Sequence, residues 1–597
     1  MSCFSSRRIE VSGLVLFLAL AVGVPNRQGF AQRGGRGGGG GGAAQEAKPI
    51  EGLIPVTEPL VVQKCGSCHT ADAKGNLTRI SAARATPEGW EEAIKRMVRL
   101  NGLQITPDEA RKIVRYLSDT HGLAPEEAAK VEYFAEHRLI DETYPDAETR
   151  RACASCHAIA KPLSWRRAPE DWDLLKNMHL AFFPSIQNSF GGGGGGGGAA
   201  VGGVPPATAA PGAGGAAPAR PVMAVDTALT YIKKTAPLAT PEWAAWAPNV
   251  TAPKLTGTWM LTGYMPGKGK FFGRTKIAES PTGYTTHTDI SFLNGTKYSL
   301  DGTSLVYTGY AWRGRSKGAA KIESIGAPNG LREVMMLSKD QSSITGRWFW
   351  GTYEEFGLDV TLRRETVAPA VLGTDISSLK AGSTDAPVTI YGSHLGTTLT
   401  PADIDLGKGV TVTKVVSATP EMVTLTASVD AAAVPGPRLI SVAGVTLPAA
   451  YAVYEKIDFL KVTPTTALAH LGSEPHAKGY MQFEALAYSF GPDGKPNTDD
   501  DIDLGPVPAT WSIEEFIASY GDDDIKYVGK IDPKTGFFTP SSDGPNPERK
   551  SMRNNYGDVW SVARYTPTGA KNPLIGKSYL IVSVPQYVQW DQPEVAQ

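Results

Sequence analysis

The sequence predicts a multidomain α + β protein, with an all-α N-terminal domain followed by an antiparallel β-barrel and two immunoglobulin-like β-sandwich domains. Three observations support this prediction. A chain of 597 residues is too long for a single hydrophobic core. Apolar residues recur at helical spacing as far as residue 190, and beyond Trp243 they alternate as in strands, with Gly and Asn at the turns.

The N-terminal residues have the order of a secretory signal peptide. Arg7 and Arg8 precede an apolar run at 11–24, and small residues flank Phe30. Because the run is short for a transmembrane helix, we expect residues 1–31 to be removed and the mature protein to be periplasmic, with an uncleaved anchor as the alternative. The net charge of -1, with 20% charged residues, gives no basic field for binding nucleic acid.

Two C-x-x-C-H runs are the strongest functional signal. In such a run the two thiols attach one haem and the adjacent imidazole ligates its iron. The alternatives are a pair of disulfides, a zinc site or a redox C-x-x-C. A zinc site would not need a His directly after the second Cys of each pair, and a thioredoxin-type motif occurs once near a βαβ pattern. The runs are Cys65-Gly66-Ser67-Cys68-His69 and Cys153-Ala154-Ser155-Cys156-His157. They predict two covalently bound haem c groups, with His69 and His157 as proximal ligands.

The helical region at 50–190 is therefore predicted to be a dihaem cytochrome c domain of two units, 50–123 and 124–190. In each unit a helix start with Pro in its first turn and a following Trp comes after the haem motif. These starts are Thr-Pro-Glu-Gly-Trp at 86–90 and Ala-Pro-Glu-Asp-Trp at 168–172. The correspondence indicates an internal repeat.

Each six-coordinate iron needs a second axial ligand. Met97 lies seven residues after Trp90, and His179 lies seven residues after Trp172, so the two have the same position in the repeat. We expect Met97 and His179 to be these ligands. The alternatives are His121 for the first haem and Met178 for the second. Since thioether sulfur raises the potential of a haem, electrons are expected to enter at the second haem and leave from the first.

Glycine-rich segments and strand patterns define the remaining regions. Residues 32–49 are predicted to be a Gly-rich tether, and the Gly/Ala/Pro insertion at 191–221 contains too little apolar surface to order itself. Six or more sequential strands at 250–367 predict an antiparallel β-barrel. Residues 368–455 and 456–597 are strand-rich and are predicted to form the two immunoglobulin-like β-sandwiches.

The loop at 493–503 is rich in aspartate, which suits calcium. It lacks the EF-hand spacing and the Glu at the twelfth position. We interpret it as a solvated acidic hairpin loop, with calcium as the weaker alternative.

The order of these regions resembles the α (dihaem cytochrome) subunit of quinohaemoprotein amine dehydrogenase across nearly the whole predicted mature chain. The resemblance depends on the two haem motifs and on three further runs. These runs are Trp-Glu-Glu-Ala-Ile-Lys-Arg-Met from Trp90 to Met97, Met178-His179-Leu180 before Phe182-Phe183-Pro184, and Asn555-Tyr556-Gly557-Asp558-Val559-Trp560. The glycine-rich tether and the insertion at 191–221 depart from the family pattern.

The resemblance implies a periplasmic complex that oxidises primary amines to aldehydes and ammonia. A cysteine tryptophylquinone would lie on a separate small subunit, beside a β-propeller subunit. This chain would pass electrons to an external acceptor such as a small cytochrome c or a blue-copper protein. No residue of this chain is expected to be catalytic for amines.

The cysteine count agrees with that implication. Of five cysteines, four lie in the haem motifs, and the fifth, Cys3, lies in the predicted signal peptide. No thiol of the mature chain remains to form the quinone, so the amine chemistry is expected on another polypeptide. The alternative function is a free-standing dihaem cytochrome c, or the electron-accepting subunit of another exported dehydrogenase.

Overall fold

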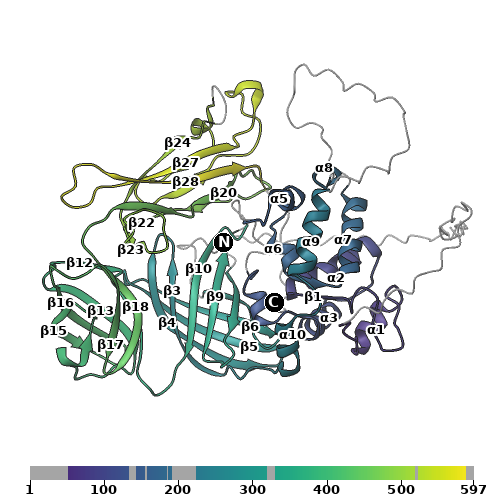
Figure 1. Cartoon of the computed structure of the whole chain (residues 1–597), viewed down its shortest axis with the longest axis horizontal. Coiled ribbons are helices and arrows are strands. Elements are labelled where there is room, and N and C mark those ends of the chain that lie inside the picture. Colours follow the sequence, from purple (N-terminus) through teal and green to yellow (C-terminus); the bar gives the residue numbers. More distant parts are fainter. Residues whose placement is uncertain are drawn as a thin grey trace, which may run out of the picture. The chain divides into compact units, whose positions relative to one another are not determined.

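The computed structural model describes residues 52–132, 143–154, 157–183, 186–190, 223–318, 330–351, 353–517 and 522–585 (Figure 1). These residues belong to one compact unit, Ile50–Gln597. The predicted signal peptide at 1–31, the tether at 32–49, the insertion at 191–221 and Cys156 lie outside the described residues. No helix in the described part of the chain is long and apolar enough to cross a membrane.

The N-terminal region is helical, as predicted. Thr86 and Thr106 cap two of its helices, each with its hydroxyl accepting a backbone N–H and with Pro in the first turn. The helices are α1 (Pro59–Cys65), α2 (Pro87–Asn101), α3 (Pro107–Thr120), α4 (Pro125–Ala128), α5 (Ala147–Cys153), α6 (Ala160–Leu163), α7 (Pro169–Phe182), α8 (Gln187–Phe190), α9 (Ala224–Thr235) and α10 (Pro241–Trp246).

A two-stranded ribbon joins the two repeat units. Strand β1 (Ala83–Ala85) pairs antiparallel with β2 (Trp165–Arg167), and Arg84 lies opposite Arg166 at the centre. The two arginines are equivalent in the repeat, since each lies six residues before the Trp of its unit. The units therefore meet at a local two-fold axis between Arg84 and Arg166.

One carboxylate neutralises this arginine pair. Glu127, on α4, accepts hydrogen bonds from Arg84 Nη1 and Nη2 at 2.8 and 3.0 Å and from Arg166 Nε at 3.0 Å. All three side chains are buried. Burial raises the pKa of Glu127, but the hydrogen bond from Arg84 and the charges of both arginines outweigh burial and lower it. The carboxylate is therefore held ionised between the two arginines.

The structure extends the second unit beyond its predicted end at residue 190. In the first unit, Trp90 Nε1 and the Ala85 N–H both donate to the carbonyl of His121, directly after α3. In the second, Trp172 Nε1 and the Arg167 N–H both donate to the carbonyl of Ala236, directly after α9. Helix α9 is thus the counterpart of α3, and the insertion at 191–221 falls inside the second unit.

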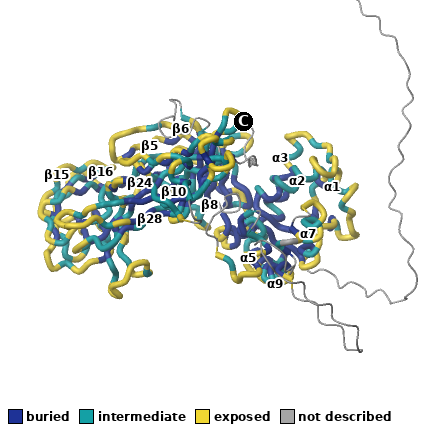
Figure 2. Tube along the Cα trace, turned by 90° about the horizontal axis from the view of Figure 1, so that it is seen from above, coloured by how far each residue is buried: buried dark blue, intermediate teal, exposed yellow. Residues whose placement is uncertain are grey.

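A closed antiparallel barrel follows, as predicted. Along β5 buried and exposed residues alternate, with the buried face inward, and the trace of β8 is almost entirely buried (Figure 2). Trp259, Trp312 and Trp348 are among the largest buried side chains. Among the described residues the barrel contains β3 (Gly257–Met265), β4 (Gly269–Ser280), β5 (Gly283–Phe292), β6 (Lys297–Tyr307), β7 (Ala311–Gly318), β8 (Leu331–Leu337), β9 (Ser343–Trp350) and β10 (Phe356–Arg364), which pairs with β3.

The third region has two four-stranded sheets around one core that includes Ile390, Leu425 and Val453. Their orders are β11-β13-β16-β15 and β12-β18-β17-β14. The strands are β11 (Ala370–Thr374), β12 (Ser378–Lys380), β13 (Ala386–Ser393), β14 (Ile404–Asp405), β15 (Val410–Ala418), β16 (Met422–Val429), β17 (Gly436–Val442) and β18 (Val445–Tyr454).

The fourth region has three sheets, of orders β19-β22-β23, β20-β28-β27-β24 and β21-β26-β25. Its strands are β19 (Phe459–Thr463), β20 (Thr466–His470), β21 (Met481–Gln482), β22 (Glu484–Ser489), β23 (Ile502–Pro506), β24 (Thr510–Glu515), β25 (Gly529–Ile531), β26 (Phe537–Pro540), β27 (Gly557–Tyr565) and β28 (Leu574–Ser583). The immunoglobulin-like character of the third and fourth regions stays a prediction.

Candidate haem-binding sites

The first C-x-x-C-H run begins at the end of a helix. Cys65 is the last residue of α1, and its carbonyl accepts hydrogen bonds from the N–H groups of Cys68 at 3.2 Å and His69 at 2.9 Å. This turn places both thiols and the imidazole at the helix end, where Cys68 is exposed and Cys65 and His69 are half-buried. Burial, followed by the nearby Cys68, raises the pKa of the Cys65 thiol. Both sulfurs are accessible for attachment.

The His69 ring is oriented by its own loop. Its Nδ1 donates to the carbonyl of Thr78 at 2.8 Å. A histidine that ligates a metal typically donates its other ring N–H to a carbonyl or carboxylate, which fixes both the tautomer and the ring direction. If His69 ligates a metal, this hydrogen bond assigns the ligation to its Nε2.

The second run repeats this arrangement. Helix α5, capped by Asp146, ends at Cys153, which is half-buried. His157 Nδ1 donates to the carbonyl of Ala158 at 2.9 Å. Cys156 lies outside the described residues, so its placement stays a prediction.

The predicted distal ligands lie at equivalent positions on equivalent helices. Met97 is on α2 and His179 is on α7, and both are half-buried. The sulfur of Met97 accepts a hydrogen bond from Asn101 Nδ2 at 3.6 Å. His179 Nδ1 donates to the carbonyl of Leu175 at 2.9 Å, the same type of bond that orients the proximal histidines. This bond favours His179 over its neighbour Met178 as the ligand.

In each unit the proximal and distal elements pack on a shared core. Cys65 and Ile94, which lies one turn before Met97, contact the cluster that contains Trp90 and Trp172. Cys153 and Leu180, which follows His179, contact the cluster of α8 and α9. In each unit a cysteine of the C-x-x-C-H run and a residue of the helix with the predicted second ligand thus pack against the same cluster.

His121, the alternative ligand for the first haem, is instead a buried structural residue. Its Nδ1 bonds the Thr120 hydroxyl at 2.8 Å and its Nε2 bonds the Ile54 carbonyl at 3.1 Å, so both ring nitrogens are occupied. Its ring meets Trp90 edge-on. Burial lowers the pKa of His121 to about 4. Its counterpart in the second unit is Ala236, which has no ligating atom.

Exposed apolar side chains adjoin both predicted distal ligands. Leu100 is 54% exposed and lies three residues after Met97, while Phe182 is 52% exposed and lies three residues after His179. Three residues along a helix is close to one turn, so each apolar side chain is on the ligand's face. The flat, largely apolar face of a haem bound beside either ligand would cover these side chains. The residues present therefore suit the group.

Metal ligation by carboxylates is not favoured at the acidic loop at 493–503. Asp501 is paired with Lys461 and accepts from the Thr498 N–H, and Asp500 accepts from the Asp493 N–H. Within the described residues the one group of three potential ligand atoms lying within 4.8 Å of one another is elsewhere, at Glu515, Asp522 and Asp524. Among the described residues, neither the loop nor the first haem motif forms such a group.

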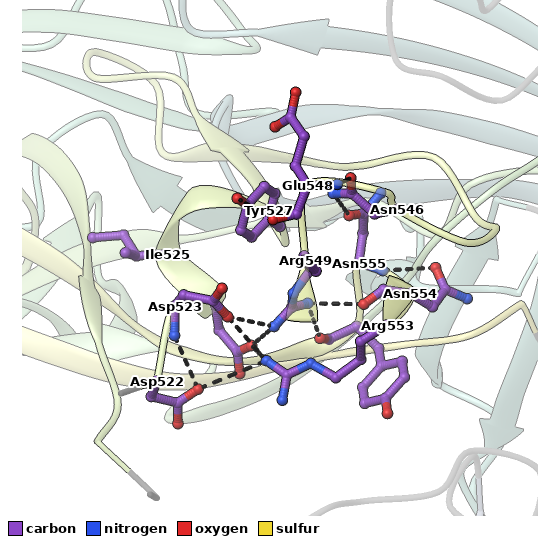
Figure 3. Close-up of polar contacts among 12 residues, drawn as sticks. Asp522, Asp523, Ile525, Tyr527, Asn546, Glu548, Arg549, Arg553, Asn554 and Asn555 are labelled. Carbon is purple, nitrogen blue, oxygen red and sulfur yellow. Dashed lines mark hydrogen bonds and ion pairs between the residues drawn. The ribbon is translucent and has the colours of Figure 1, made fainter. Parts of the chain in front are cut away.

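Asp522 and Asp524 of this group belong to an ion-pair network with two arginines, which Figure 3 shows. Arg549 and Arg553 both pair with Asp523 and Asp524, and the Arg549 side chain is fully buried. Arg549 Nη1 also donates to the carbonyls of Asn554 and Tyr556. The guanidinium groups supply the positive charge that a cation would bring, so we interpret the network as a structural brace of the loop before β27.

Comparison with known proteins gives a consistent family match. Family models match four segments, and together these cover most of the chain. They are described as quinohemoprotein amine dehydrogenase A, alpha subunit, haem binding (residues 56–192), and quinohemoprotein amine dehydrogenase, alpha subunit, domain II (252–365), domain III (368–455) and domain IV (460–595). Curated proteins gave no match.

Solved structures give only weak likenesses. A redesigned β-barrel, mFAP1, bound to DFHBI is 18% identical over 18% of this chain and 94% of its own, with a TM-score of 0.16. Human protocadherin-24 EC1-2 is 15% identical over 37% of this chain and 100% of its own, with a TM-score of 0.14. Drosophila N-cadherin EC1-4 is 10% identical over 51% and 71%, with a TM-score of 0.14. Scores this low carry no functional meaning.

Proposed function

The chain belongs to the quinohaemoprotein amine dehydrogenase alpha-subunit family, and on this premise we propose that it is the dihaem electron-transfer subunit of a periplasmic complex that oxidises primary amines. Membership makes it a haem-binding subunit of an oxidoreductase complex. The observation that supports the proposal best is the shared orientation of His69, His157 and His179. Each donates its Nδ1–H to a backbone carbonyl, as iron-ligating histidines do.

Two covalently bound haem c groups follow from the paired motifs. Cys65 and Cys68 would hold the first and Cys153 and Cys156 the second, each through two thioether bonds. When bound, a haem supplies one-electron redox chemistry that no side chain of this chain offers. The protein contributes the axial ligands, the apolar walls at Leu100 and Phe182, and the hydrogen bonds that orient the imidazoles.

The two sites are proposed to differ in potential. Met97 would give the first site a thioether ligand, which favours ferrous iron, whereas His179 would give the second site a second imidazole. The site of Cys153, Cys156 and His157 would then have the lower potential and would receive electrons from the quinone side. The site of Cys65, Cys68 and His69 would deliver them to a small cytochrome c or a blue-copper protein.

The amine chemistry is assigned to partner subunits. We propose a cysteine tryptophylquinone on a small subunit and a β-propeller subunit beside it. Support comes from the cysteine count, because the predicted mature chain has no thiol outside its two haem motifs. Without a partner this chain is expected to be inactive toward amines.

The test measures haem content and amine-dependent reduction of the purified protein. We expect the mature mass to exceed that of the polypeptide by two haems that resist acid-acetone extraction. Addition of a primary amine should reduce these haems in the complex and leave the isolated chain oxidised. Extractable haem, a single haem, or amine oxidation by the isolated chain would contradict the proposal.

A further inference from the structure

A cluster of arginines surrounds one carboxylate at the boundary of the two repeat units. Asp171, near the start of α7, is 3% exposed. It accepts a hydrogen bond from Arg79 Nε at 2.9 Å through one oxygen and pairs with Arg167 through the other. Arg167 is 6% exposed and stacks over Trp165 at 4.1 Å. The Arg167 Nε has no hydrogen-bond partner, although it is buried. The cluster is built into the fold and not fully satisfied.

Arg79 comes from the proximal side of the first haem site. It directly follows Thr78, whose carbonyl orients the His69 ring. Its backbone has φ 68°, in the left-handed region that side chains other than Gly rarely adopt. Such a conformation persists only where surrounding contacts hold it, and it is typical of ligand-binding segments. The strained backbone directs this arginine toward Asp171.

Arg96 comes from the distal side of the same site. It precedes Met97 on α2 and lies within electrostatic reach of both Arg79 and Asp171. Among the described residues no carboxylate lies within ion-pair distance of its guanidinium, and Glu92, one turn earlier, pairs with Lys161. The proximal loop and the distal helix therefore each bring an arginine to the same place.

The arginine cluster has more positive charge than its carboxylates neutralise. Three guanidinium groups face Asp171, and Glu92, which also acts on Arg96, is paired with Lys161, so these groups together have an excess of two positive charges in a half-buried location. Uncompensated charge in such a place is costly unless an anion binds there. A haem carries two propionate carboxylates on one edge, and arginine matches carboxylates with charge and with paired N–H donors. The excess equals the charge of the two propionates.

We propose that Arg79, Arg96 and Arg167 bind the propionates of the first haem and that Asp171, from the second unit, partly offsets their charge. This inference rests on the proposed covalent attachment of that haem at Cys65 and Cys68. The arginines are positioning residues, which fix the haem edge and raise its potential by favouring ferrous iron.

The repeat itself indicates that the cluster serves one haem only. The positions equivalent to Asp171, Arg167 and Arg96 are Gly89, Ala85 and Met178. A Cβ at Gly89 would lie 3.0 Å from the Ala85 Cβ and 3.1 Å from the Trp165 ring, so no carboxylate can be placed there. The second site has no matching set of arginines at these positions.

Redox titration of the full-length haem-loaded protein tests the proposal. Arg96→Gln should make the reduction of the first haem about tenfold less favourable, which lowers its midpoint potential by about 59 mV for one electron. Arg96→Lys keeps the charge and should restore most of the wild-type potential. Arg99→Gln is the matched control, because Arg99 is exposed on the same helix, and it should leave both potentials unchanged.

A Cys65→Ala/Cys68→Ala variant keeps only the second haem, so its redox titration identifies the midpoint potential of that haem. Adding Arg96→Gln to this variant should leave that potential unchanged. Haem content is counted first, so that loss of a haem in the wild type refutes the proposed function rather than this inference. With both haems present, an unchanged first wave in Arg96→Gln would overturn the inference. An equal shift in Arg99→Gln, or a shift of the second wave alone, would overturn it as well.

Discussion

The two haem units share one backbone plan but differ at the positions that determine redox behaviour. Trp90 donates to the carbonyl that follows α3, and Trp172 donates to the carbonyl that follows its counterpart α9. Seven residues after each Trp, one unit has Met97 and the other has His179. On the proposed assignment, the repeat fixes the position of the distal ligand, while the side chain at that position would set the potential of the haem.

The largest expected effect comes from removing the carboxylate at the axis between the units. Glu127→Ala leaves Arg84 and Arg166 buried without a counter-charge, which should lower the free energy of unfolding of the haem domain by about 3–5 kcal/mol. Denaturant titration followed by far-UV circular dichroism measures it. Glu126→Ala is the control: Glu126 pairs with Lys339 at an exposed position, and its loss should cost less than about 1 kcal/mol. Equal costs would show that the two-fold contact does not hold the units together.

The second prediction concerns His121, whose counterpart in the second unit, Ala236, cannot titrate. Burial, together with the charge of Arg84, lowers the pKa of folded His121 to about 4, against about 6.5 in the unfolded chain. Between these values the unfolded state binds more protons, so this contribution to stability is present above pH 6.5 and is lost as the pH falls toward 4, up to about 3 kcal/mol.

The measurement is the pH dependence of unfolding for the wild type and for His121→Gln. The difference between the two curves should shrink as the pH falls through this window, and both haem spectra should remain unchanged. A changed haem spectrum in His121→Gln would indicate that His121 ligates an iron.

The third prediction exchanges the ligand types. Met97→His makes the first unit resemble the second. Reduction of the first haem should become at least about tenfold less favourable, so its midpoint potential should fall by about 59 mV or more. Spectroelectrochemical titration should show the higher wave falling and the lower wave staying in place. If the lower wave moves, or if neither wave moves, the assignment of Met97 is wrong.

The smallest expected effect compares the two indole hydrogen bonds. Trp90 Nε1 lies 2.9 Å from its carbonyl acceptor and Trp172 Nε1 lies 3.3 Å from its acceptor. Replacement of each Trp by Phe keeps an aromatic ring and removes the donor, so each should cost about 1 kcal/mol, with the larger loss at Trp90. Thermal unfolding of the two variants measures the difference. A larger loss at Trp172 would show that packing, not the hydrogen bond, decides the cost.

Much of this arrangement is readable from the sequence. The C-x-x-C-H runs define both haem motifs by their spacing, and counting from Trp90 and Trp172 pairs Met97 with His179. Alternating apolar residues predict the barrel, because a strand with one buried face has a period of two. Leu100 and Phe182 could have been found in the same way, since they too are equivalent in the repeat.

Other features leave no local signal. Helix α9 was not assigned to the second unit, because the insertion at 191–221 separates it from the rest of the repeat. The ribbon of β1 and β2 has strands of only three residues, too short for a periodic pattern. The acceptor for His69 is the Thr78 backbone carbonyl, which any residue type could supply. Asp171 and its arginines meet only through the tertiary fold.

The bonds of Arg84 have a consequence for the order of folding. This residue lies early in the chain, yet its guanidinium donates to the carbonyls of Gly122 and Leu238, to Glu127 and to the Thr240 hydroxyl. A buried arginine with these donors unmet is costly, so we expect the first unit to be less stable until residues 238–240 are in place. The first unit is therefore expected to pack fully only after residue 240 is in place. The entropy cost of closing so long a loop then falls in a late folding step. The first C-x-x-C-H run therefore belongs to a unit that we expect to complete its packing only after more than a hundred further residues have been added.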